Sequence, residues 1–146
     1  MRVLIQRVKS ASVKVSDEVI GKIDNGLLVF VGFTEGDSLK EIEYMADKVV
    51  NLRIFDDENG VMNKSVLDTG GSVLSVSQFT LYGDASKGRR PSYAHALNPT
   101  DASNLYDIFN EELRKYIKVE TGKFQAEMEV SLVNDGPVTI AVEKWK

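Results

Sequence analysis

Residues 26–33 read Gly-Leu-Leu-Val-Phe-Val-Gly-Phe, and Leu27 to Val31 is the longest uninterrupted apolar run in the chain. Successive side chains of a strand point to opposite faces, so a strand built from this run is apolar on both faces. That pattern is typical of a strand at the centre of a sheet that is covered on each side. Asn25-Gly26, immediately before the run, is a strong signal for a tight hairpin turn.

The segments before and after this central strand predict further strands. Residues 2–8 and 11–15 alternate with the period of a strand, and residues 19–23 follow a turn signal at 16–18. Such closely spaced strands predict an antiparallel meander. Near the end of the sequence, residues 127–133 and 138–145 predict two last strands joined across residues 134–137.

Two segments have the periodicity of amphipathic helices. Ser38-Leu39-Lys40-Glu41 fits a capping box, and Pro99-Thr100 fits the first turn of a second helix. The predicted apolar stripes are Leu39, Ile42, Met45, Val49 and Leu52 in the first helix, and Ala102, Leu105, Phe109, Leu113 and Tyr116 in the second. The elements together predict an α+β fold, with a mostly antiparallel, strongly curved or partly closed barrel-like sheet and two packed helices.

The composition narrows the range of functions. The 146 residues include no Cys and a single His, and the formal net charge is −4. This length fits one domain, residues 1–146, and the lack of Cys suits a reducing, cytoplasmic location. We expect no membrane partner, because there is no signal-peptide pattern and no apolar run long enough to span a bilayer. The negative charge argues against DNA binding and limits any RNA contact to a local patch.

Several enzyme classes lack support in the sequence. There is no P-loop, no G-x-G-x-x-G, no H-E-x-x-H and no G-x-S-x-G pattern. A Ser-His-Asp triad would have to use His95, whose loop-like context favours a surface or packing role. We therefore expect a reaction that needs little acid–base help, and no metal or organic cofactor.

Two short segments stand out. Ser77-Gln78-Phe79-Thr80-Leu81 ends an apolar strand with polar residues, and Asn134-Asp135-Gly136-Pro137-Val138-Thr139 lies near the C-terminus. Taken singly, the first has a structural explanation, since Ser and Thr often bond neighbouring backbone, and the second fits a plain hairpin turn. Together they resemble the SQFTL and NxGPVT signatures of the D-aminoacyl-tRNA deacylase family. Residues 1–8, 26–33, 51–55 and 87–92 resemble that family too, so the resemblance covers essentially the whole chain.

The resemblance implies an esterase that frees D-amino acids from tRNA. Hydrolysis of such an activated ester is accelerated by positioning a water and by hydrogen bonds to the developing oxyanion. The candidate catalytic residues are Ser77, Gln78, Phe79 and Thr80. The backbone of Phe79 and Thr80 would supply the oxyanion donors, and the Thr80 hydroxyl would position substrate or water, because no base is evident to make it a nucleophile. The 2′-hydroxyl of the terminal adenosine offers a proton relay.

The resemblance also implies how the enzyme distinguishes D-amino acids from L-amino acids. In the family, the Gly-Pro of NxGPVT is a cis dipeptide that reaches into the partner subunit of a homodimer. The carbonyls of Gly136 and Pro137 would then form a rigid wall where an L side chain would have to go. Glycine has no side chain to exclude, so glycyl-tRNA would also be hydrolysed.

Four basic residues complete the candidate site. Arg7 lies on an apolar strand face with Val3 and Ile5, where it would bond either a carbonyl pair such as that of Gly136-Pro137 or an acid at the sheet edge. Lys87, Arg89 and Arg90 would bind phosphates of the tRNA acceptor end, unless they form a solvated loop. The alternative functions are a non-catalytic dimeric module that binds nucleic acid or another partner, and a general esterase.

Overall fold

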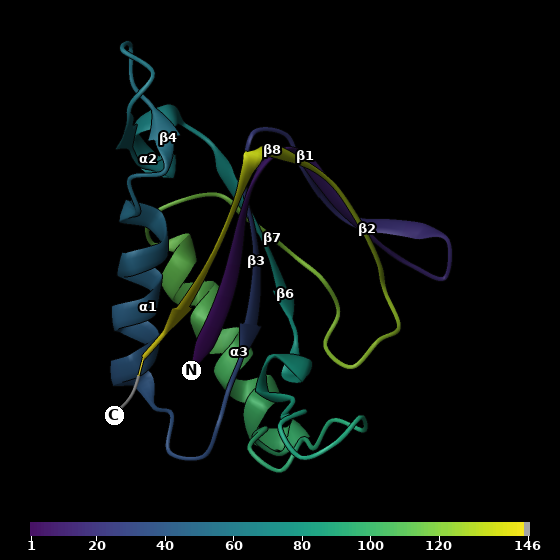
Figure 1. Ribbon diagram of the computed structural model, residues 1–146. Coiled ribbons are helices and arrows are strands. Elements are labelled where there is room, and N and C mark those ends of the chain that lie inside the picture. The colour runs from purple at the N-terminus through teal and green to yellow at the C-terminus, as the bar shows by residue number, and fades with distance from the viewer. Residues whose placement is uncertain (145–146) are drawn as a thin grey trace.

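The computed structural model describes residues 1–144 (Figure 1). The larger sheet contains β1 (Arg2–Val15), β2 (Glu18–Ile23), β3 (Gly26–Gly32), β6 (Ser72–Ser77), β7 (Val119–Thr121) and β8 (Glu129–Glu143). The smaller one is the hairpin of β4 (Phe55–Asp56) and β5 (Met62–Lys64). The helices are α1 (Leu39–Asn51), α2 (Val66–Thr69) and α3 (Pro99–Arg114), and η1 (Phe79–Tyr82) is a 3₁₀-helix.

The predicted central strand is confirmed as β3. Its Leu27, Leu28 and Val29 are completely buried, and it lies between β1 and β6. β1 pairs antiparallel with β2, β3 and β8, whereas β3–β6 and β6–β7 are parallel pairs. The α+β class is therefore confirmed, but the sheet is mixed. The parallel pairs arise because α1 and α3 each carry the chain back across the sheet before the next strand.

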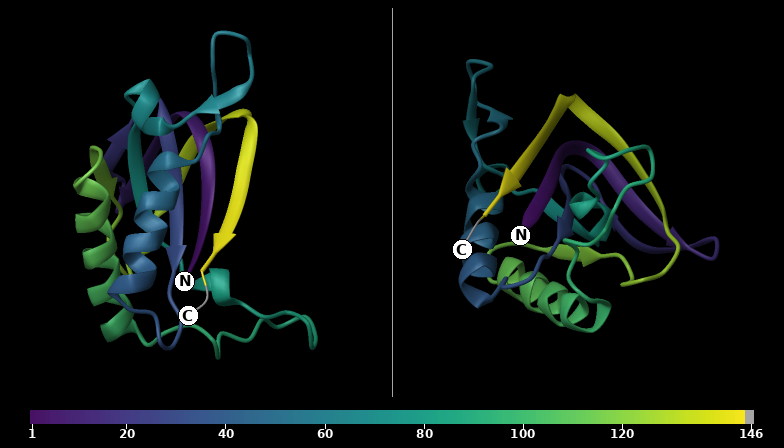
Figure 2. Two further views of the ribbon diagram at one scale, coloured as in Figure 1. Left: turned by 90° about the vertical axis from the view of Figure 1, so that its left-hand side faces the viewer. Right: turned by 60° about the horizontal axis from the view of Figure 1, so that its bottom comes forward.

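The predicted pairs of short strands at the two ends of the chain are each one long strand. β1 replaces the two strands expected within residues 2–15, and β8 replaces the two expected after residue 127. β1 and β8 pair with each other from Arg2–Glu143 to Lys14–Glu129, with register shifts near Val8. Residues 134–137 are therefore a sharp bend within β8 and not a hairpin turn (Figure 2). The expected end of the last strand at Trp145 lies outside the described residues.

The two predicted helices are confirmed as α1 and α3, which lie side by side on one face of the sheet (Figure 1). The Glu41 carboxylate accepts hydrogen bonds from the backbone N–H and the hydroxyl of Ser38. These bonds, led by the one from the hydroxyl, lower the pKa of Glu41 below its usual value. Three residues at the ends of the predicted stripes depart from the prediction: Leu39 is half exposed, and Leu52 and Tyr116 lie beyond the C-terminal ends of α1 and α3.

The sheet has an apolar core on each side. One core fills the space between the sheet and α1 and α3, and the other lies inside the curl of the sheet and includes Val13, Leu28 and Leu74. A Cβ at Gly21 of β2 would lie 2.9 Å from the carbonyl oxygen of Thr121 in β7. The curled sheet is therefore nearly closed, as predicted. Within residues 1–144, no helix is long and apolar enough to cross a membrane.

Candidate active site

The first signature segment lies where β6 ends. Gln78 continues the pairing by donating its N–H to the Val31 carbonyl at 2.7 Å, and the chain then turns into η1. Because η1 begins at Phe79, the N–H groups of Phe79 and Thr80 precede its first internal hydrogen bond, from Leu81 to the Gln78 carbonyl. Neither group donates a hydrogen bond to any residue in 1–144. The strand was expected to continue to Thr80; instead, the turn frees two adjacent backbone donors.

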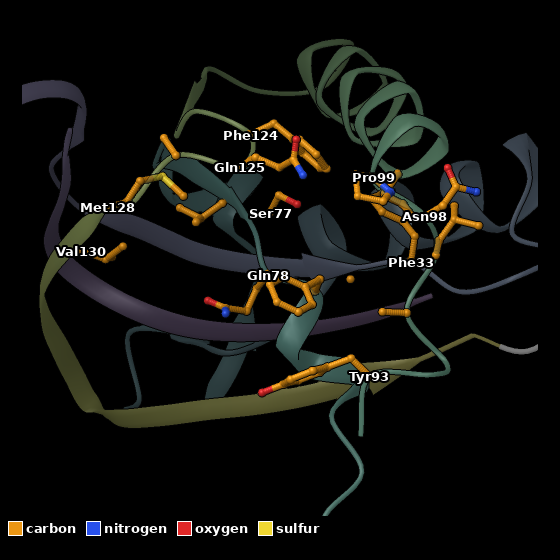
Figure 3. A pocket seen from close by; sticks show the side chains of 17 residues that line it. Phe33, Ser77, Gln78, Tyr93, Asn98, Pro99, Phe124, Gln125, Met128 and Val130 are labelled. Atoms are coloured by element: carbon orange, nitrogen blue, oxygen red, sulfur yellow. The ribbon is translucent and has the colours of Figure 1, made fainter. Parts of the chain in front are cut away.

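A cavity of about 640 Å³ opens beside this turn (Figure 3). Its walls come from the ends of β3 and β6, the start of η1, the segment that leads into α3 together with the first turn of α3, and the segment between β7 and β8 together with the start of β8. The lining residues are Gly32, Phe33, Val76, Ser77, Gln78, Phe79, Tyr93, Ala96, Leu97, Asn98, Pro99, Ala102, Phe124, Gln125, Ala126, Met128 and Val130. None of these is an acid, a histidine, a lysine or an arginine, so the cavity offers hydrogen bonds and apolar surface without formal charge.

Two of the four candidate catalytic side chains contact each other. The Gln78 amide donates a hydrogen bond to the Thr80 hydroxyl at 2.5 Å. Ser77 and Gln78 line the cavity together with Phe79, while Thr80 is exposed next to them. Among the described residues, the Thr80 hydroxyl has no hydrogen bond to a carboxylate or an imidazole. The Thr80 hydroxyl is thus held by the Gln78 amide, and no base within residues 1–144 is hydrogen-bonded to it.

Arg2 holds η1 in place, a role that the sequence did not reveal. Its guanidinium donates to the Leu81 carbonyl at 2.9 Å, lies 4.4 Å from the centre of the Tyr82 ring, and pairs with the Glu143 carboxylate. Burial raises the pKa of the Tyr82 phenol, so it stays neutral. A Cβ at Gly32 would lie 3.0 Å from the Gln78 carbonyl oxygen, which shows how closely β3 supports the same turn.

The second signature segment forms the bend of β8. The Gly136-Pro137 peptide bond is cis, and both residues are exposed. The Asn134 amide spans the bend by donating to the carbonyls of Arg7 and Val138, at 2.9 and 3.0 Å. The bend is thus fixed by hydrogen bonds on both sides while its tip faces outward.

Arg7 supports this bend from a buried position, with 6% of its surface exposed. It donates to the carbonyls of Asp135 at 3.1 Å and Ile54 at 2.7 Å, so its carbonyl partners are not those of Gly136 and Pro137. The carboxylates of Asp135 and Asp56 lie 3.5 and 3.8 Å from its nitrogens. Both expected kinds of partner, a carbonyl pair and acids at the sheet edge, are therefore present together.

The structure does not bring the two signature segments together within one chain. Asn134 pairs with Val8 of β1, Val8 with Gly26 of β3, and Gly26 with Ser72 of β6. Ser77 lies five residues farther along β6, which corresponds to roughly 16 Å at 3.3 Å per residue. The bend of β8 and the end of β6 thus lie at opposite ends of the sheet (Figure 1).

The three basic residues after η1 lie on an exposed arm, which we define as residues 84–92. Asp84 and Ser92 close the arm through two backbone hydrogen bonds, each 2.8 Å long. Lys87, Arg89 and Arg90 are all exposed along it. His95 follows the arm and is also exposed, outside the cavity lining.

Several cavity residues were not predicted, because no sequence pattern shows that they meet at one site. Phe33, Tyr93, Phe124 and Met128 come from four separate parts of the chain and meet only in the folded protein. Gln125 has a positive φ of 60°, a conformation that residues other than glycine adopt uncommonly. No sequence signal marks that conformation.

Comparisons with known proteins find relatives over nearly the whole chain. The D-Tyr-tRNA(Tyr) deacylase family matches residues 4–143. Proteins named D-aminoacyl-tRNA deacylase from Brevibacillus brevis and Bacillus cytotoxicus are each 59% identical over 144 residues, covering 98% of this chain and 99% of theirs.

Two solved structures share the fold. One, named c-Myc DNA Unwinding Element Binding Protein, is 42% identical with a TM-score of 0.95, and each chain is covered completely. The other, described as a probable eukaryotic D-amino acid tRNA deacylase, is 19% identical with a TM-score of 0.82 over 97% of each chain, and it supports the fold alone. By the match of nearly its whole length, the chain belongs to the D-Tyr-tRNA(Tyr) deacylase family.

Proposed function

We propose that the protein is a D-aminoacyl-tRNA deacylase that removes D-amino acids from mischarged tRNA in the cytoplasm. The observation that carries this proposal is that, among residues 1–144, the N–H groups of Phe79 and Thr80 donate no hydrogen bond and lie beside a cavity whose lining residues carry no charge. A water would add to the ester carbonyl, and the oxyanion would accept hydrogen bonds from these N–H groups. The 2′-hydroxyl of the terminal adenosine would relay the proton to the leaving ribose oxygen, which restricts the reaction to RNA.

We further propose that the active site is shared between two copies of the chain. The exposed tip at Gly136-Pro137 lies too far from η1 of its own chain to border the substrate there. In a two-fold homodimer, the tip of one subunit would reach the cavity of its partner, and each subunit would contribute to both sites. The carbonyls of the tip would then exclude an L side chain.

A comparison of four substrates tests the proposed activity. D-Tyrosyl-tRNA and glycyl-tRNA should be hydrolysed, whereas L-tyrosyl-tRNA and L-alanyl-tRNA should react about 10–100 times more slowly, because overpacking a rigid site costs about 1–3 kcal/mol. Release of labelled amino acid measures each rate. Hydrolysis of D-tyrosyl-tRNA with glycyl-tRNA spared would contradict exclusion by backbone atoms.

Mixing two variants, each of which should be inactive alone, tests whether the active site is shared between subunits. Phe79→Pro removes one backbone donor from η1, and Arg7→Ala removes the support of the β8 bend. A mixed dimer would contain one site with both changes and one with neither. After subunit exchange, about one site in four should therefore be intact, and deacylation should recover to about that fraction of the normal rate.

The matched control mixes Phe79→Pro with Thr80→Ala. Both changes lie in η1, so no mixed dimer gains an unaltered site, and activity should not rise. No recovery in the first mixture, despite demonstrated exchange, would show that each site is built from one chain. Recovery in the control would show that the gain in activity does not come from a site shared between η1 of one subunit and the bend of its partner.

The alternative is a dimeric module that binds nucleic acid without catalysis. The solved structure named for DNA unwinding element binding is the observation that favours it. The four-substrate assay separates the two functions, because a binding module would leave all four esters intact.

A further inference from the structure

Two large aromatic side chains lie exposed at the mouth of the cavity. The rings of Phe79 and Tyr93 contact each other edge to face, with centres 5.1 Å apart and an angle of 65° between the planes. Phe79 is 55% exposed and Tyr93 is 42% exposed, so neither ring belongs to an apolar core. In the close-up, Tyr93 borders one side of the cavity and Phe124 and Gln125 border the other (Figure 3). We call Phe79 and Tyr93 the aromatic pair.

The backbone fixes the position of Tyr93. The double hydrogen bond between Asp84 and Ser92 ends immediately before it, and its carbonyl accepts a hydrogen bond from Ala96 at 3.0 Å. A Cβ at Gly83 would lie 3.0 Å from the Tyr93 ring, so the ring packs directly on the backbone there. An exposed ring that is held in this way loses little conformational entropy when a flat ligand stacks on it.

The segment of the chain that carries Tyr93 is basic, although the whole chain is acidic. Residues 83–98 contain three basic residues, Lys87, Arg89 and Arg90, and one acidic residue, Asp84. The whole chain, in contrast, has a net charge of −4. The Asp84 carboxylate accepts a hydrogen bond from the Ser86 N–H at 2.9 Å. Hydrogen bonds with Ser86 lower the pKa of Asp84, so its charge is engaged within the arm. Within residues 1–144, none of the three cations forms an ion pair, so they can bind phosphates, which is the charge complementarity that a nucleic acid needs.

We propose that the aromatic pair and the arm bind the single-stranded 3′ end of the RNA substrate. The unpaired base next to the terminal adenosine stacks on Tyr93, while phosphates of the same strand contact Lys87, Arg89 and Arg90. This proposal rests on the proposed function, which places the terminal ester at the N–H groups of Phe79 and Thr80. Tyr93 contacts Phe79, whose N–H group would bind the ester, so the nucleotide next to the ester would lie within reach of the Tyr93 ring. Proteins commonly hold single strands by this combination of aromatic stacking and cationic side chains.

Tyr93→Ala should act on a tRNA substrate far more than on a single nucleoside. Stacking contributes about 1–3 kcal/mol per base, so KM for D-tyrosyl-tRNA should rise about tenfold with little change in kcat. D-Tyrosyl-adenosine has no second base to stack. In Tyr93→Ala, kcat/KM for D-tyrosyl-adenosine divided by kcat/KM for D-tyrosyl-tRNA should therefore be about ten times larger than in the unaltered protein. Tyr93→Phe keeps the ring and should restore the normal ratio.

Tyr116→Ala is the matched control, because Tyr116 is 43% exposed but lies beyond the end of α3. That variant should keep the ratio of the unaltered protein. A tRNA that lacks the base next to the terminal adenosine should itself bind about tenfold more weakly, and Tyr93→Ala should weaken it no further. In addition, replacing Lys87, Arg89 and Arg90 by Gln should flatten the salt dependence of tRNA binding.

The possible failures are distinct. If Tyr93→Ala impairs both substrates equally, or the base-free tRNA still responds fully to the variant, then the ring does not stack on that base. If salt dependence is unchanged in the triple variant, the arm does not bind phosphate. Failure of the unaltered protein to hydrolyse either D-tyrosyl substrate would instead overturn the proposed function.

Discussion

Phe79→Pro should lower kcat for D-tyrosyl-tRNA about 10²–10³-fold relative to Phe79→Ala, because it deletes one of the two proposed oxyanion donors. Both variants lose the aromatic ring, but only proline loses the backbone N–H. That N–H donates no hydrogen bond within residues 1–144, so its removal costs the folded protein no internal bond. The contrast between the two variants therefore isolates the interaction with the oxyanion.

The local backbone accepts proline at this position. Phe79 is the first residue of η1, where the φ angle of a 3₁₀-helix is close to that of proline. Gln78 has φ −141° and ψ 82°, and so lies outside the helical region that a following proline disfavours. Denaturant unfolding should give similar stabilities for the two variants. Equal rates of deacylation, with both proteins folded, would remove the Phe79 N–H from the mechanism.

The sequence predicted burial better than strand direction. Leu27 to Val31 is apolar on both faces, and that pattern specifies a covered strand whichever way its neighbours run. The parallel pairing of β3 with β6 depends on how α1 and the β4–β5 hairpin return the chain, which no local pattern encodes. The bend at residues 134–137 was predicted as a connection between strands, because glycine and proline mark both turns and bends.

The candidate site was predictable where its residues are adjacent in the chain. The segment 77–80 was identified as a unit and does place its polar groups beside a cavity. Tyr93, Phe124 and Gln125 reach the same cavity through loops whose shape depends on distant contacts, such as that of Tyr93 with Gly83. The partners of Arg7 also required the structure, because Ile54 and Asp135 are 47 and 128 residues away in sequence.

Gly136→Ala should reduce the free energy of unfolding by about 2–4 kcal/mol, through a strained backbone and an overpacked side chain. The φ of Gly136 is +124°, which L residues rarely adopt. A Cβ there would lie 2.9 Å from a Val138 methyl carbon and 3.0 Å from a terminal nitrogen of Arg7. Arg7 is buried and holds the Asp135 carbonyl, so it cannot move away without breaking that bond. Deacylation should fall as well, because the bend would shift.

Gly88→Ala is the matched control for this change. Gly88 has a similar φ of +134°, but no atom of residues 1–144 lies within 4 Å of the position its Cβ would take. Gly88→Ala should share the backbone penalty of Gly136→Ala but lack the steric one. The loss of stability should therefore be larger for Gly136→Ala by about 1–3 kcal/mol in denaturant unfolding. Equal losses of unfolding free energy in the two variants would mean that the bend is not supported by the contact with Arg7. A normal rate of deacylation in Gly136→Ala would mean that the bend takes no part in the reaction.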